Sequence, residues 1–231
     1  MSFVGLKNPG LLNIRDDNGT LVTGGNQYWY PAEGFIPNGA CGATAASNTL
    51  GYLIMTRGSL YDVACETGLI GPLMPKGFLA KTHSQEHAVT PMQKPEYLDF
   101  MKKVYEYLYP HPGGLMADGF AEGIRGLALK YKLKLDTECL KIMISRKLRP
   151  PLEEVSAFIK TPLQADLPVA FLILSGGCVS VLDTWHWVTI LGLDEEKGSV
   201  QITDNGKVFT AELGPWLETS IMGGAFVRFS L

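Results

Sequence analysis

Three side chains that lie far apart in the sequence, Cys41, His186 and Asp204, have the types needed for nucleophilic catalysis by a thiol. A thiolate attacks a carbonyl carbon, an imidazole moves the proton, and a carboxylate fixes the imidazole tautomer and stabilises its charged form. A cysteine alone is usually a small buried hydrophobe, and a histidine alone is usually a core residue satisfied by a neighbour. The three types in this order along the chain are far more informative than any one of them.

The residues around Cys41 predict a helix that begins beside it. Apolar residues recur at helical spacing over 41–55, and Asn38 is the expected N-cap, which places Cys41 in the first turn. A helix N-terminus and a nearby imidazolium both lower the pKa of a thiol. The small neighbours Gly39 to Ala43 would let a substrate approach the backbone, where the Cys41 N–H could serve as one oxyanion donor.

A predicted β-hairpin late in the chain brings His186 close to Asp204. Placing Leu193 opposite Ser199 makes His186 and Asp204 diagonal neighbours on one face, within reach of an imidazole–carboxylate hydrogen bond. The alternation of apolar and polar residues favours this register, because a slip by one residue would bury the polar set. A bulge in the turn or just after the second strand would instead favour Asn205 as the partner.

The elements that must hold these residues follow a simple order. Helical patterns dominate the first two-thirds of the chain and strand patterns the last third, which predicts an α+β fold with an antiparallel sheet. A turn signal also predicts an early hairpin between 12–14 and 21–22. The further expected helices are 95–109, 118–132 and 151–160, and the expected strands are 169–174, 187–193, 199–203, 207–210 and 225–229.

Several stretches resemble the papain-like cysteine peptidases of the C39-like group. Asn-Gly-Ala-Cys-Gly-Ala-Thr resembles the helix start that carries the nucleophile in that group, with Ala43 where the group often has proline. Asn205 stands where the group usually has proline after its third catalytic residue. The resemblance covers about residues 26–55 and 115–206, and no counterpart is found for 56–114. The matching stretches are 38–48, 167–174, 186–194 and 200–204.

This resemblance implies a papain-like α+β fold in a single domain over residues 1–231. The helical half would span about 38–160, and the β half about 165–231 together with the N-terminal strands. The site would lie in the cleft between the two halves.

The resemblance also implies a role for each site residue. Cys41 would be the nucleophile, His186 the base and then the acid, and Asp204 the residue that orients the imidazole. Such enzymes use an upstream glutamine as a second oxyanion donor, and Gln27 is the only glutamine before Cys41. Asn38 is an alternative donor.

The implied activity is hydrolysis of a peptide or isopeptide bond in a peptide or protein substrate, through an acyl-thioenzyme and with no metal or organic cofactor. Two alternatives remain open. The same triad could transfer the acyl group to an amine, as transglutaminase-like and amide-synthesising relatives do. The fold could also serve as a non-catalytic peptide-binding module in which Cys41 is structural.

Composition excludes several other classes. A net charge of −3 gives no electrostatic footprint for nucleic acid, and the longest apolar run, 169–174, is too short to span a bilayer. Residues 1–10 lack the features of a signal peptide, so a cytoplasmic location is expected if Met1 is native and secretion if the chain has been trimmed. His83 and His87 have the spacing of metal ligands on a helix, but their neighbours favour a solvated loop.

Overall fold

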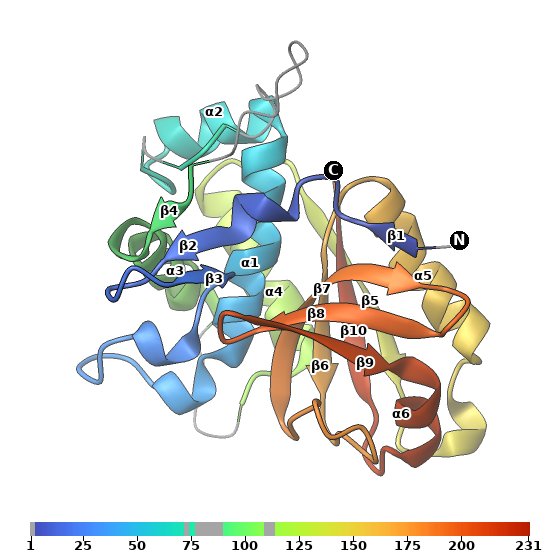
Figure 1. Cartoon of the computed structure of the whole chain (residues 1–231). Coiled ribbons are helices and arrows are strands. Elements are labelled where there is room, and N and C mark those ends of the chain that lie inside the picture. The colour runs from blue at the N-terminus through green and yellow to red at the C-terminus, as the bar shows by residue number, and fades with distance from the viewer. Residues whose placement is uncertain (1–2, 72–73, 77–89, 109–113) are drawn as a thin grey trace.

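The computed structural model describes residues 3–71, 74–76, 90–108 and 114–231 (Figure 1). Within these residues the chain is α+β, with helices and a large antiparallel sheet, as the sequence predicted. His83 and His87 lie outside them. The helices are α1 (Cys41–Thr56), α2 (Gly58–Glu66), α3 (Lys94–Leu108), α4 (Ala117–Lys130), α5 (Leu152–Gln164) and α6 (Leu213–Thr219). The strands are β1 (Phe3–Gly5), β2 (Asn13–Arg15), β3 (Leu21–Thr23), β4 (Met92–Gln93), β5 (Asp136–Ile142), β6 (Val169–Ile173), β7 (His186–Asp194), β8 (Ser199–Asp204), β9 (Lys207–Glu212) and β10 (Gly224–Ser230).

The large sheet has the strand order β5-β10-β6-β7-β8-β9, and β1 adds to β7 beyond the end of β6. Each of these pairings is antiparallel. A small sheet of order β3-β2-β4 contains the predicted early hairpin, β2–β3. In the described part of the chain, no helix is long and apolar enough to cross a bilayer.

Helices cover both faces of the large sheet. Alternate residues of each strand point to opposite faces, so each face has side chains that pack against a helix. On one face, the Trp187 ring stacks on Phe120 of α4 with ring centroids 4.4 Å apart. On that same face, the Thr189 hydroxyl donates to the Ala45 carbonyl of α1. On the other face, Phe171 packs edge-on against Trp216 of α6, and α5 contacts the sheet there through Arg228 and Phe158.

Helix α1 is buried along almost its whole length, which explains its small and apolar sequence. Thr44 and Ser47, which would otherwise bury unpartnered hydroxyls, donate to carbonyls one turn earlier. The expected N-cap is wrong: Ala40 occupies that position without a side-chain cap, while Asn38 lies in the preceding 3-10 turn, η3 (Pro37–Gly39). Cys41 is therefore the first residue of the helix.

Helix α5 extends past the end expected from Pro162, which lies inside it. Proline has no N–H to donate to the carbonyl four residues earlier, which belongs to Phe158. An Arg228 guanidinium nitrogen from β10 donates to that carbonyl at 3.4 Å instead. A partner from a distant strand thus compensates for the missing helical hydrogen bond.

The register of the β7–β8 hairpin differs from the expected one near its turn. Ser199 pairs with Asp194 and not with Leu193, one residue off the prediction. An irregularity at Leu191, between Ile190 and Gly192, then shifts the pairing back by one residue. The two departures cancel, so the end of the hairpin that carries His186 and Asp204 has the predicted register.

Candidate active site

Cys41 is presented at the N-terminus of α1, where the first-turn N–H groups have no intrahelical partners and favour negative charge. The side chain is buried, with only 5% of the residue exposed. At the next residue, Gly42, an added Cβ would lie 2.9 Å from Cδ2 of Leu115 and 3.3 Å from Cδ1 of Trp187, so these side chains would have to shift. The start of the helix therefore lies close to Leu115 and to Trp187 of β7.

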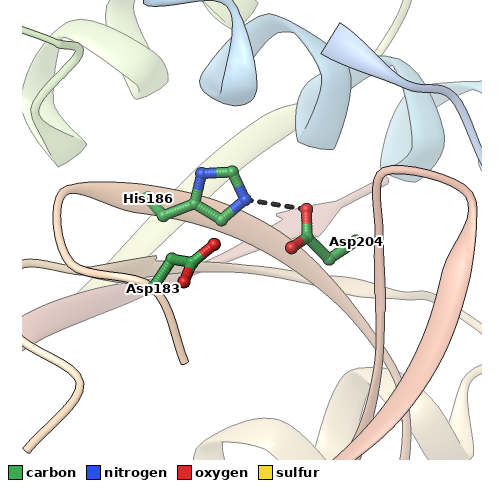
Figure 2. Close-up of side chains that lie close together, drawn as sticks. All are labelled: Asp183, His186 and Asp204. Carbon is green, nitrogen blue, oxygen red and sulfur yellow. Dashed lines mark hydrogen bonds and ion pairs between the residues drawn. The ribbon is translucent and has the colours of Figure 1, made fainter. Parts of the chain in front are cut away.

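His186 is the first residue of β7 and lies under the start of α1. Its Nε2 atom hydrogen-bonds with Oδ1 of Asp204 at 2.7 Å (Figure 2). Because the carboxylate occupies Nε2, the nitrogen on the opposite side of the ring, Nδ1, is the one left for the Cys41 sulfur.

The protonation of His186 is set by its two neighbours. Burial alone would lower the pKa of the imidazole, because it disfavours the charged form. Hydrogen bonds with Asp204 and with Cys41, together with the charges of these two groups, outweigh burial and raise the pKa to about 10. Both partners therefore favour the charged form of the ring.

The three side chains Cys41, His186 and Asp204 line one cavity between α1 and the β7–β8 hairpin. Its volume of about 10 Å³ is room for roughly one water molecule. The other lining residues are Thr44, Ala45, Asn48, Trp187, Val188, Thr189, Thr203 and Asn205.

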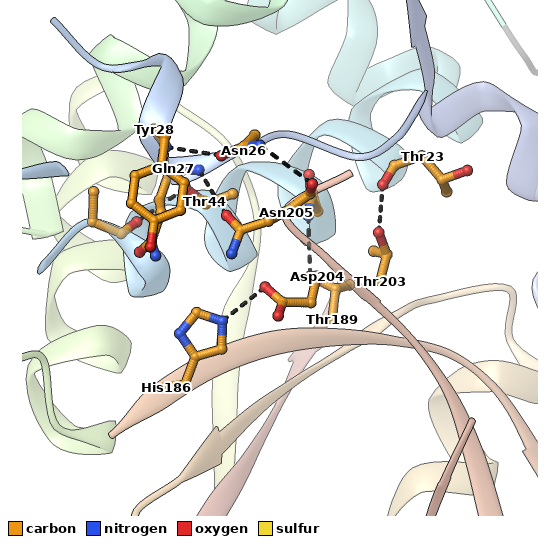
Figure 3. Close-up of polar contacts among 12 residues, drawn as sticks. Thr23, Asn26, Gln27, Tyr28, Thr44, His186, Thr189, Thr203, Asp204 and Asn205 are labelled. Carbon is orange, nitrogen blue, oxygen red and sulfur yellow. Dashed lines mark hydrogen bonds and ion pairs between the residues drawn. The ribbon is translucent and has the colours of Figure 1, made fainter. Parts of the chain in front are cut away.

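Asp204, and not Asn205, contacts the imidazole. Asn205 has a positive φ of 46°, in the left-handed region that asparagine tolerates better than most residues, and its side chain binds a different segment. Its Oδ1 atom accepts the backbone N–H of Gln27 at 3.1 Å (Figure 3).

Gln27 begins a short 3-10 turn, η2 (Gln27–Trp29), and is 6% exposed. Its Oε1 atom is buried and has no hydrogen-bond partner in the described part of the chain. Gln27 is not among the residues that line the small cavity, but its backbone N–H is bonded to Asn205, which does line it.

Sequence reasoning missed Asp183, an exposed residue of the loop before β7. One carboxylate oxygen of Asp183, a ring nitrogen of His186 and a carboxylate oxygen of Asp204 lie within 4.8 Å of one another (Figure 2). A cation bound through Nε2 of His186 would replace the hydrogen bond of that atom with Asp204. The only signal in the sequence is an acidic residue three positions before the histidine, in a loop whose path no local pattern predicts.

Comparisons with known proteins give little further information. No family model matches the chain, and no curated protein is significantly similar to it. Solved structures that align weakly with the chain include two peptidase domains. One is the peptidase domain of Streptococcus ComA, described as a bifunctional ABC transporter involved in a quorum-sensing pathway, at 13% identity over 84% of this chain and 94% of that one, with a TM-score of 0.35. The other is the peptidase domain of Streptococcus mutans ComA, at 13% identity over 59% of this chain and 89% of that one, with a TM-score of 0.32. Scores this low do not establish a common fold.

Proposed function

We propose that the protein is a cysteine peptidase that hydrolyses a peptide or isopeptide bond through an acyl-thioenzyme, with Cys41, His186 and Asp204 as its catalytic triad. The observation that carries this proposal is the environment of His186. Its ring lies between a buried cysteine and a carboxylate, and these two groups raise its pKa to about 10. A histidine between a cysteine and a carboxylate is placed to move the proton in thiol-mediated acyl transfer.

Each residue has a defined task in this reaction. The Cys41 sulfur attacks the carbonyl carbon, and the oxyanion that forms accepts hydrogen bonds from the Cys41 N–H and from the Gln27 side-chain amide. His186 gives its proton to the leaving amine, which departs and leaves a thioester. His186 then takes a proton from water as the water attacks the thioester; the C–S bond breaks, the Cys41 thiolate is released, and the acid product leaves. Asp204 holds the ring in the required orientation throughout.

The architecture that fits this proposal is one papain-like domain over the whole chain. Helix α1 would belong to a helical half of about 38–160, and the β7–β8 hairpin to a β half of about 165–231. The supporting observation is that the start of α1 and the end of this hairpin together line the small cavity at the site.

Alkylation by iodoacetamide at pH 6 tests the proposal without knowledge of the substrate. All four cysteines are free, and Cys178 is exposed while Cys41 is buried. Exposure alone therefore predicts that Cys178 reacts faster, whereas an activated thiolate predicts that Cys41 does. We expect Cys41 to be labelled at least about tenfold faster than Cys178, and this advantage to disappear in His186→Asn. Slow labelling of Cys41, no faster than that of Cys178, would favour a non-catalytic binding module.

A further inference from the structure

We infer that Asn205 is a positioning residue, which ties the segment that carries Gln27 to the strand end that carries Asp204. The inference rests on the proposed function, because it concerns the oxyanion donor of that reaction. It assigns a role to a residue that takes no part in bond formation or proton transfer in the proposed mechanism.

Asn205 is bonded to the Gln27 segment by both its side chain and its backbone. Its Oδ1 atom accepts the N–H of Gln27 at 3.1 Å, and its carbonyl accepts from Nδ2 of Asn26 at 3.3 Å (Figure 3). The Asn26 side chain in turn accepts the N–H of Tyr28 at 2.9 Å and caps the 3-10 turn that Gln27 begins. One asparagine therefore holds the start of this turn at two points.

The backbone around Asn205 explains why the two contacts coexist. Asn205 and Gly206, with φ values of 46° and 83°, form the tight turn between β8 and β9. This left-handed backbone directs residue 205 toward the early segment, while Asp204 still ends β8 beside His186. The Gly206 carbonyl accepts the N–H of Thr23 at 3.0 Å, so the turn is joined to the same early segment a second time.

Within the part of the chain that the structure describes, the Gln27 side chain lacks a hydrogen bond at its amide oxygen. Its Oε1 atom is buried and has no hydrogen-bond partner in the described residues, so the amide lacks a polar anchor at that atom. Asn205 holds the backbone from which this side chain extends. Loss of the Asn205 side chain would let the oxyanion donor shift while the hydrogen bond between His186 and Asp204 stays intact.

Two reactions of Cys41 distinguish displacement of the oxyanion donor from loss of the hydrogen bond between His186 and Asp204. Acylation by p-nitrophenyl acetate passes through a tetrahedral oxyanion and needs the oxyanion donor, whereas alkylation by iodoacetamide displaces iodide at a saturated carbon and forms no oxyanion. In Asn205→Gly the left-handed backbone is retained and the side-chain acceptor is lost. We expect its acylation rate to fall by about tenfold, because a displaced donor loses part of the roughly 100-fold or greater effect of such a group. The alkylation rate at pH 6 should stay within about twofold of wild type.

Asn205→Asp is the matched control, because aspartate keeps an oxygen acceptor at the same place and tolerates the same backbone. Its acylation rate should lie clearly above that of Asn205→Gly. Asn205→Ala, which also lacks the acceptor, is the second loss variant and replaces Asn205→Gly if the latter does not fold, as judged by its thermal unfolding.

A double-mutant cycle with Gln27→Ala decides whether Asn205 acts through Gln27. If it does, Asn205→Gly slows acylation in the wild type and adds less than about a twofold loss in the Gln27→Ala background. Multiplicative losses, or an equal fall in acylation and alkylation, would overturn the inference while leaving the catalytic triad in place. Failure of wild-type Cys41 to react selectively in either assay would instead overturn the proposed function, and this inference with it.

Discussion

Replacement of Asp204 by asparagine is the most direct test of the electrostatics at the site. The substitution keeps the size of the side chain and one oxygen acceptor, and removes the negative charge that bonds Nε2 of His186 at 2.7 Å. The rise of the His186 pKa from an ordinary 6.5 to about 10 corresponds to a preference of roughly 5 kcal/mol for the imidazolium. Burial opposes the charged form, so loss of one of the two groups that outweigh it must lower the pKa.

We expect the pKa of His186 in Asp204→Asn to fall by about 1–3 pH units, which is the usual effect of an opposite charge at this separation. The assay is an NMR titration of the imidazole Cε1–H resonance, assigned by its absence in His186→Asn. Asp183→Asn is the matched control, because Asp183 also has a carboxylate oxygen within 4.8 Å of a ring nitrogen. The causes that raise the pKa lie with Asp204 and Cys41, so this control should keep a value near 10.

A pKa that stays near 10 in Asp204→Asn would refute this reasoning. The reasoning would also be refuted if the pKa of His186 fell as far in Asp183→Asn as in Asp204→Asn. The hydrogen bond with Asp204 would then not be the reason for the raised pKa.

Three further outcomes are expected. A histidine whose pKa is higher in the folded state stabilises the fold fully below its unfolded pKa, and this stabilisation is lost as the pH rises through its folded pKa. The free energy of unfolding of the wild type, measured by urea titration, should therefore fall between about pH 6.5 and pH 10. The part of this fall that is due to His186 should be absent in His186→Asn. Phe120→Ala should lower the free energy of unfolding by about 3–5 kcal/mol, because this fully buried ring stacks on Trp187; a loss below about 1 kcal/mol would contradict that packing. Asp166→Ala should cost about 1–3 kcal/mol in the same measurement, because the Tyr52 hydroxyl that donates to Asp166 at 2.7 Å would be left without its acceptor, and Asp166→Asn should cost clearly less.

The sequence predicted elements whose signals are local. The expected ranges 95–109 and 118–132 place α3 and α4 to within a few residues of where they lie. Alternation in β7 and β8 predicted the contact between His186 and Asp204, which is present. The predicted register is correct at this end of the hairpin because the irregularity at Leu191 cancels the one-residue shift near the turn.

Elements that depend on distant partners were not predicted. Strand β5 lies between helical segments and is recognisable only through its pairing with β10. The extension of α5 past Pro162 depends on Arg228, some 70 residues away. The contact between Gln27 and Asn205 joins residues 178 positions apart. No local propensity encodes these partners, because they meet only after the chain has packed.

Strand β1 has a consequence for self-association. It pairs with Leu193 and Asp194 of β7, and Leu6 extends the contact to the Leu191 carbonyl. Gly5 of β1 pairs with Gly192 of β7, and the Phe3 ring lies over Gly192 so closely that an added Cβ there would lie 2.4 Å from it. Displacement of β1 by proteolysis or by a bulky side chain at this glycine would uncover amide and carbonyl groups along β7. Another polypeptide could then add a strand there, so this short segment also protects the protein from aggregation through an open sheet edge.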